Sequence, residues 1–152
     1  MAHRNQHSDE RNALIADQGF DRDEKVLLHV ARLYFLAYTD PCEPHWEQAI
    51  DHCVGSFGPG RGPRIAYGVT DVLRAMREAR KGVFRFTNPC CAKCAARLTD
   101  GERLLINTIA SMRRGDKARA RVNALMLCEG HDTSILLDAA QRLSASMEAL
   151  RA

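Results

Sequence analysis

The sequence lacks the long apolar runs that cross membranes. Its longest apolar stretch, residues 26–38, is broken by His29 and Arg32, whereas a transmembrane helix needs about 20 apolar residues. Residues 1–10 are polar and hold no apolar core segment, so they do not look like a secretory signal. We therefore expect a cytoplasmic protein with no membrane partner, whose cysteines stay reduced.

Several catalytic motifs are also missing. The chain holds no Gly-x-Ser-x-Gly and no His-Glu-x-x-His. Its glycine-rich segment, residues 58–62, lies among prolines and is not followed by the Lys-Ser/Thr of a phosphate-binding loop. No internal repeat stands out. These absences favour a binding role over catalysis.

The composition is that of one soluble domain, with 152 residues, 45% apolar and 27% charged. Apolar residues recur at helical spacing nearly throughout, and capping boxes begin at Asp21 and Thr99. We predict an all-α fold: a single helical domain of about six helices over residues 9–152, after a polar tail at 1–8. The expected helices are 22–38, 44–57, 64–81, 100–114, 116–129 and 133–150, with a short one before Gly19. Residues 83–87 alternate apolar and polar, and we expect an extended segment without a strand partner.

Two short pairs of metal ligands dominate the sequence. Cys91 and Cys94 are separated by two residues, and so are Cys128 and His131. Together they supply three thiolates and one imidazole, a complete tetrahedral set for Zn²⁺. We therefore predict a structural zinc held by Cys91, Cys94, Cys128 and His131, with a zinc-knuckle-like turn after Pro89. This ion would pin residues 84–94 against the turn between the last two long helices.

The metal prediction leaves alternatives open. Cys90 could replace Cys91, and the pair Cys42 and His45 could complete the site or form a second one with His52 and Cys53. Four thiolates at Cys90, Cys91, Cys94 and Cys128 would suit an iron–sulfur cluster. Cys90, Cys91 and Cys94 could instead form a thiol redox sensor. A zinc ion with an open position would suit a hydrolase, with Glu47 or Glu129 as its base.

The positive charge is concentrated in the middle of the chain. Residues 61–121 hold 15 Lys or Arg and 5 Asp or Glu, although the net charge is only +3. This region could face nucleic acid through Arg113, Arg114 and Lys117, or it could pair with the acidic ends of the same chain. We predict a non-catalytic zinc-binding regulatory or interaction module. Its partner would be another protein, a second copy of the chain, or nucleic acid.

Overall fold

The computed structural model describes residues 12–148, and it is mainly helical. Helices make up 70% of it, and the helices are packed into a single compact domain. This confirms the predicted all-α fold. The helices among these residues are α2 (Arg22–Thr39), α3 (His45–Phe57), α4 (Gly62–Ala79), α5 (Ala92–Ala95), α6 (Asp100–Arg113), α7 (Lys117–Leu127) and α8 (Ser134–Glu148).

The two predicted capping boxes are both formed. At the start of α2, the Glu24 N–H donates to Asp21 Oδ1 at 2.8 Å, and the Asp21 N–H donates to Glu24 Oε2 at 2.9 Å. Thr99 and Glu102 make the same reciprocal pair at the start of α6. Each box satisfies amide groups that a helix start leaves without intrahelical partners. The sequence therefore located these two helix starts correctly.

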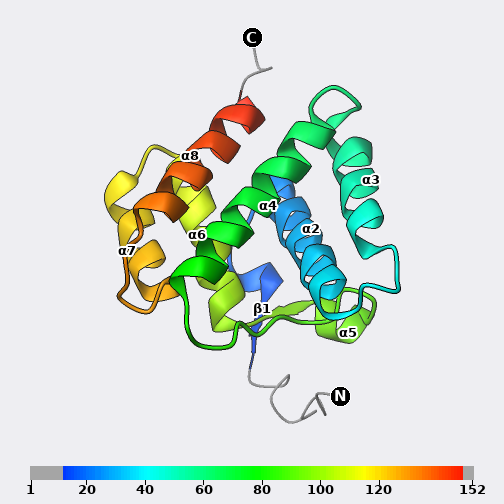
Figure 1. Ribbon diagram of the computed structural model, residues 1–152, viewed down its shortest axis with the longest axis horizontal. Helices are drawn as coiled ribbons and strands as arrows, with labels where there is room; N and C mark the ends of the chain where they lie inside the picture. Colours follow the sequence, from blue (N-terminus) through cyan, green and yellow to red (C-terminus); the bar gives the residue numbers. More distant parts are fainter. Residues whose placement is uncertain (1–11, 149–152) are drawn as a thin grey trace.

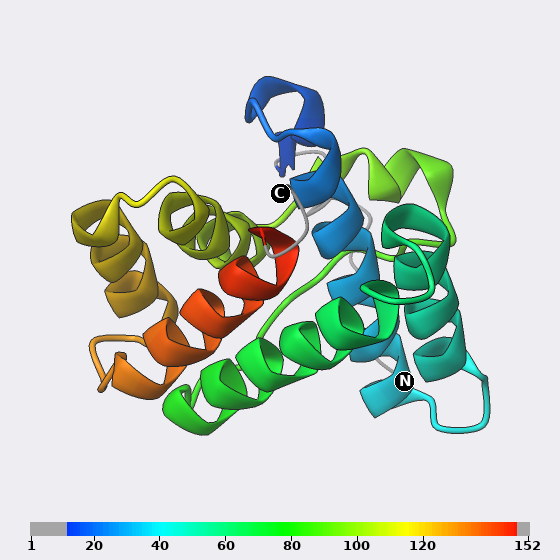
Figure 2. The ribbon, with the colours of Figure 1, turned by 90° about the horizontal axis from the view of Figure 1, so that it is seen from above.

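The helices form two groups of three that meet through α4 and α8. Helix α3 packs against α2 and α4, whereas α6 packs against α7 and α8. Figures 1 and 2 show α3 and α7 on opposite sides of the molecule, with α4 and α8 side by side between them. Large side chains buried in the shared core include Leu27, Leu28, Ile65, Leu73, Met76, Leu105, Leu127, Leu136 and Leu143.

The predicted loop between α3 and α4 is shorter than expected. Helix α4 begins at Gly62 rather than Arg64, with Pro63 in its first turn, where proline is well tolerated. A Cβ atom added at Gly62 would lie 2.5 Å from Val54 Cα, so the two backbones touch at this corner. Glycine is required here for close packing.

The sequence did not predict the small sheet. Strand β1 (Ala13–Leu14) pairs antiparallel with β2 (Arg97–Leu98), with Ala13 opposite Leu98. The 3₁₀ helix η1 (Ile15–Asp17) follows, where we expected a short α-helix. The start of that helix and the predicted tail lie outside the described residues. Residues 83–87 form no strand, in agreement with the extended segment expected there.

Candidate functional site

The first pair of predicted ligands lies in a tight turn, which we call the cysteine turn (residues 88–95). The Cys90 N–H donates to Asn88 Oδ1 at 2.9 Å, and the Cys94 N–H donates to Cys91 Sγ at 3.4 Å. Cys90 is exposed, whereas Cys91 and Cys94 are half-buried. The structure therefore places Cys91 and Cys94 on one turn near the surface, with a sulfur that accepts a backbone hydrogen bond.

A buried ion pair anchors the cysteine turn to the core. Arg32 Nε lies 2.6 Å from Glu102 Oε2, and their side chains are 3% and 0% exposed. The same guanidinium donates to the carbonyl oxygens of Ala95 at 2.9 Å and Arg97 at 2.5 Å. Because Arg32 is on α2 and Glu102 is on α6, this pair fixes the end of the turn to both helices.

The second pair of predicted ligands has a different setting. Cys128 is fully buried in the hydrophobic core, and burial raises the pKa of its thiol. His131 is exposed, and its Nδ1 lies 2.8 Å from the carbonyl oxygen of Ala79. A carbonyl only accepts, so Nδ1 carries the proton in this contact. Cys128 is therefore part of the hydrophobic core, whereas His131 donates to the last residue of α4.

The structure does not bring the two pairs together. Helix α5, which lies within the cysteine turn, and helix α7, which ends at Leu127 just before Cys128, lie on opposite sides of the molecule in both ribbon views (Figures 1 and 2). Within residues 12–148, no three His, Cys, Asp or Glu side chains are grouped so as to hold a metal ion. The expected convergence of Cys91, Cys94, Cys128 and His131 is therefore absent, because the register of α7 turns Cys128 into the core.

A carboxylate makes the link that we expected from zinc. Glu129 Oε1 accepts hydrogen bonds from the N–H groups of Lys81 at 2.8 Å and Gly82 at 2.9 Å. These two bonds hold the pKa of Glu129 below its ordinary value. The segment that leads to the cysteine turn is thus attached at its start to the α7–α8 turn through Glu129.

The alternative ligands are also dispersed. Cys42 is exposed, whereas Cys53 is fully buried, and burial raises the pKa of its thiol to about 12. His45 Nδ1 lies 3.1 Å from Gln48 Oε1. The ring of His52 lies 4.4 Å from that of His29 between ring centroids. The iron–sulfur, redox-sensor and hydrolase alternatives stay predictions.

Much of the predicted basic surface is neutralised within the chain. The Arg113 side chain is only 8% exposed and lies 3.3 Å from Asp21 Oδ2 and 3.7 Å from Glu24 Oε1. Arg114 Nη2 lies 2.9 Å from the same Glu24 oxygen. The acidic start of α2 therefore covers Arg113, which leaves less of the predicted basic surface open to a partner.

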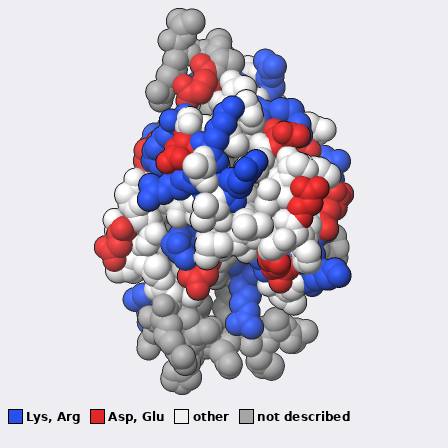
Figure 3. All heavy atoms as spheres, turned by 90° about the vertical axis from the view of Figure 1, so that its left-hand side faces the viewer, with Lys and Arg blue, Asp and Glu red and all other residues white. Residues whose placement is uncertain are grey.

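The basic residues that follow the end of α6 lie on α7. Lys117, Arg119 and Arg121 are exposed. Figure 3, which faces the side that carries α7, shows acidic and basic side chains interspersed with uncharged ones. Nucleic-acid binding stays a prediction, resting on a smaller basic surface than the sequence indicated.

A pocket of about 280 Å³ opens between the ends of α2 and α4 and the segment before the cysteine turn. The ring of Phe35 lies 4.8 Å from that of Phe84 and 5.1 Å from that of Phe86, between centroids. The pocket is lined by Phe35, Tyr38, Thr39, Met76, Arg77, Arg80, Gly82, Phe84 and Phe86. Nothing in the spacing of these residues predicted that they would meet.

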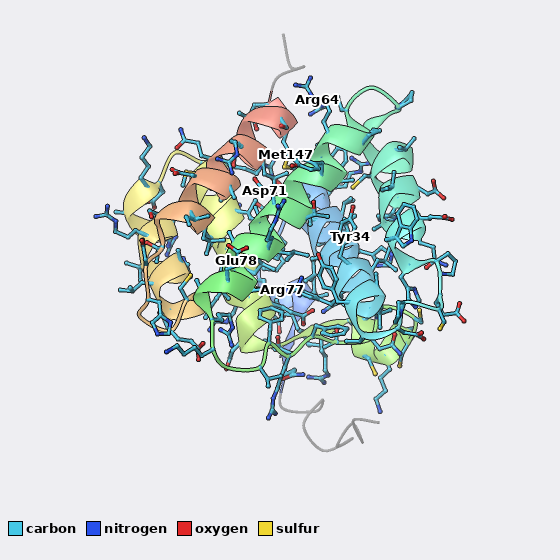
Figure 4. All side chains as sticks on the ribbon, in the orientation of Figure 1. Tyr34, Arg64, Asp71, Arg77, Glu78 and Met147 are labelled. Atoms are coloured by element: carbon cyan, nitrogen blue, oxygen red, sulfur yellow. The ribbon has the colours of Figure 1, made fainter. Side chains whose placement is uncertain are left out.

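Two guanidinium groups lie over aromatic rings of this pocket. The Arg77 guanidinium lies 4.2 Å from the centroid of the Tyr38 ring, near the end of α4 on the side facing α2 (Figure 4). The Arg80 guanidinium lies 5.5 Å from the Phe84 centroid. Its Nη1 donates to the Leu127 carbonyl at 2.7 Å, but its buried Nε has no partner among the described residues. The pocket thus combines aromatic walls with positive charge.

Comparison with known proteins adds no family. Neither models of protein families, nor curated proteins, nor solved structures match this chain. None of the helices within residues 12–148 has the length and apolar character needed to cross a membrane.

Proposed function

We propose that this protein is a non-catalytic zinc-binding module in which Cys91 and Cys94 hold the ion. One observation carries the proposal: the two cysteines share a tight turn in which the Cys94 N–H donates to Cys91 Sγ at 3.4 Å. A hydrogen bond of this kind favours the thiolate, which is the form that binds metal. Two thiolates separated by two residues are half of a structural zinc site.

The surroundings of the turn support metal binding. A metal site keeps its geometry best when its ligands stand on rigid supports. Here the end of the turn is attached to α2 and α6 by Arg32, whose side chain is 3% exposed. Cys91 and Cys94 also lie near the surface, where an ion can reach them.

The proposal links zinc to an interaction. Zinc in structural sites takes four ligands, and residues 12–148 group no third ligand with Cys91 and Cys94. The remaining ligands therefore come from residues outside this range, from a second copy, or from another protein. In each case zinc would join the cysteine turn to a second segment.

Zinc content measured under reducing conditions tests the proposal. The wild-type protein should carry about one zinc per chain, or one per two chains where a second copy supplies its own Cys91 and Cys94, since one ion fills a tetrahedral site. Cys91→Ser and Cys94→Ser should lose the metal. Cys53→Ser is a matched control, because Cys53 is a fully buried thiol on α3, and it should keep the metal. A wild-type protein that stays metal-free after incubation with zinc would refute the proposal.

The aromatic pocket supports a second candidate function, the binding of a small aromatic anion. Apolar walls with a few converging polar groups are typical of ligand sites. The volume of about 280 Å³ suits one ring with its substituent. The guanidinium groups of Arg77 and Arg80, which line the pocket, supply positive charge for a carboxylate or phosphate.

Ligand-observed NMR with three probes of one shape tests this second function. Benzoate and phenyl phosphate should bind more tightly than benzyl alcohol, which lacks the charge. Arg77→Gln should weaken benzoate binding by about 10-fold, the effect of removing roughly 1.4 kcal/mol. The control Arg74→Gln changes an exposed arginine on α4 that does not line the pocket. Equal binding of the three probes, or an equal effect of both variants, would refute anion recognition.

A further inference from the structure

Helix α7 carries large apolar side chains on the side that faces solvent. Val122, Leu125 and Met126 are 58%, 48% and 59% exposed. Residues three and four positions apart lie on one face of a helix, so these three side chains are neighbours. Ala118, four residues before Val122, is also exposed and lies on the same face. We call these four residues the α7 stripe.

The α7 stripe is not the face that packs inside the protein. Helix α7 packs against α6 and α8, and its fully buried residues are Ala120, Ala124 and Leu127. Both ribbon views place α7 at the edge of the molecule, with no described helix outside it (Figures 1 and 2). Within helix α4, by contrast, a single large apolar side chain, that of Tyr67, is exposed. Contiguous apolar patches on a protein surface commonly mark interaction sites.

Positive charge borders the α7 stripe on both sides. Arg119 and Arg121 are exposed, and helical geometry places them roughly 80° to either side of the middle of the stripe. Lys117 is exposed on the first turn of α7. The side chains of these three residues form no ion pair within residues 12–148, whereas Arg113 and Arg114 are paired with the start of α2. The stripe and its borders are therefore complementary to an apolar surface with acidic margins.

We propose that the α7 stripe binds an acidic amphipathic helix of another protein. Such a helix presents a row of apolar residues at i, i+3, i+4 and i+7. Two helices pack along such rows with their axes about 8–10 Å apart, so Asp or Glu beside the partner's row would reach Arg119 and Arg121. Glu129 and Asp132, which follow α7, already accept hydrogen bonds from backbone N–H groups. The partner's acidic residues therefore belong beside the first two turns of α7.

The size of the surface sets the kind of complex. The 11 residues of α7 span about 16 Å. An interface of this length is small, so we expect a transient complex rather than an obligate one. The cysteine turn lies on the opposite side of the molecule, so this proposal goes beyond the zinc function and does not rest on it.

Other partners fit the α7 stripe less well. A nucleic acid would place phosphates at the basic borders and gain nothing from the apolar side chains between them. Helices that lie on membrane surfaces use Trp and Phe on the apolar side, and the stripe holds neither. A second copy of α7 would bring the same basic borders to the interface, and like charges across an interface oppose binding. Figure 3, which faces this side, shows an uncharged area with basic side chains along its edge.

Three synthetic helical peptides of about 18 residues, or five turns, test the proposal in NMR titrations with the full chain. The first carries leucine at i, i+3, i+4 and i+7 along one face and glutamate elsewhere. The second replaces each glutamate by lysine, and the third keeps the composition of the first but spreads the leucines over all faces. The first should bind at least about 10-fold more tightly than the other two, because it alone matches both the stripe and its borders. It should shift the amide signals of residues 117–126.

Variants of the stripe separate specific docking from general adhesion of apolar peptides. Leu125→Gln combined with Met126→Gln should weaken binding of the acidic peptide at least about 10-fold, because these side chains are at the centre of the contact. Tyr67→Gln is the control, since it removes an equally exposed apolar side chain from α4, and it should leave binding unchanged. Circular dichroism should show all variants folded, because the changed side chains are exposed.

Variants of the borders test the charge. Arg119→Gln combined with Arg121→Gln should weaken binding of the acidic peptide by about 3-fold to 10-fold and reduce its dependence on salt. The control makes the same change of charge at Arg64 and Arg74, two exposed residues of α4. This control should have no effect on either quantity.

The remaining outcomes overturn the proposal. Equal binding of the three peptides, no binding of the first, or amide shifts confined to other helices would show that the α7 stripe is not a docking surface. Tighter binding of a DNA duplex, of single-stranded RNA or of phosphatidylserine vesicles would assign the face to that class instead. A dimer of the protein alone that the Leu125 and Met126 variant abolishes would assign it to a second copy. Chelation of zinc should leave peptide binding unchanged, so failure of this proposal and failure of the zinc function are distinguishable.

Discussion

The cysteine turn and the α7–α8 turn have nearly the same ligand spacing but very different environments. At the cysteine turn, Cys91 and Cys94 lie near the surface, and a backbone N–H donates to one sulfur. At the α7–α8 turn, Cys128 is a core residue, and His131 is hydrogen-bonded to a backbone carbonyl. The difference shows that spacing identifies candidate ligands, whereas helix register decides whether their side chains are available.

The strongest test of this comparison removes the support of the cysteine turn. Arg32→Met should lower the free energy of unfolding by about 3–5 kcal/mol, because Glu102 would stay buried without its partner. Urea denaturation measures the change. Arg142→Met is the control, because its pair with Asp71 at 2.6 Å is largely exposed, and it should cost less than about 1 kcal/mol. Equal losses would show that the buried pair does not anchor the turn.

Replacing the buried thiol of Cys128, at the α7–α8 turn, should lower stability without changing the zinc content. Cys128→Ser places a hydroxyl in the apolar core and should cost about 1–3 kcal/mol. Its zinc content, measured beside that of Cys91→Ser, should equal the wild-type value. If Cys128→Ser lost zinc and Cys91→Ser kept it, the metal would belong to the α7–α8 turn and not to the cysteine turn.

A change of pH should affect stability through two histidines, His29 on α2 and His52 on α3, which belong to neither the cysteine turn nor the α7–α8 turn. Burial lowers the pKa of His29 and of His52 below 6.5, and the charge of His52 lowers that of His29 further. Between the folded and unfolded pKa values, the unfolded chain binds more protons. The free energy of unfolding should therefore be highest above pH 6.5 and decrease as the pH falls below it.

Urea midpoints at pH 7.5 and pH 5.5 measure this dependence. The charged residues beside the pair are Arg32 for His29 and Arg22 for His52, and both act in the same direction as burial. His52→Gln should reduce the difference between the two midpoints. An unchanged difference in this variant would assign the pH dependence to other groups.

The smallest expected effect is at the α7–α8 turn. Glu129→Ala removes the acceptor for the N–H groups of Lys81 and Gly82. Hydrogen exchange of these two amides should become faster, while amides of the core helices stay protected. Glu78→Ala, at an exposed position of α4, is the control. Unchanged exchange at both amides would show that other contacts hold the segment.

The sequence predicted the local features of the fold well and the long-range contacts poorly. Capping residues and apolar periodicity act over a few residues, so the starts of α2 and α6 were correct. The pairing of β1 with β2 involves only two residues on each strand, and it joins residues that are up to 85 positions apart in the sequence. Strands this short carry no periodic signal.

The candidate site was predictable only in part. The Cys-x₂-Cys spacing correctly indicated a turn with two neighbouring thiols. The core position of Cys128 depends on how α7 packs against α6, which the spacing does not encode. The pocket likewise unites side chains from α2, α4 and residues 82–86. Its members share no sequence pattern because they meet only after folding.

The environment of Glu102 restricts this position to a single ionised side chain. Oε1 accepts from the Thr99 N–H at 2.9 Å and from Arg32 Nη2 at 3.2 Å. Oε2 accepts from Arg32 Nε at 2.6 Å and from the Thr87 N–H at 3.4 Å. Both ends of the carboxylate face donors, so a glutamine would oppose N–H to N–H in either orientation of its amide. Position 102 therefore requires a negative charge as well as the shape of glutamate. A glutamine has the same size but the wrong hydrogen-bonding groups, so it would disrupt the start of α6, the ion pair with Arg32 and the attachment of the cysteine turn together.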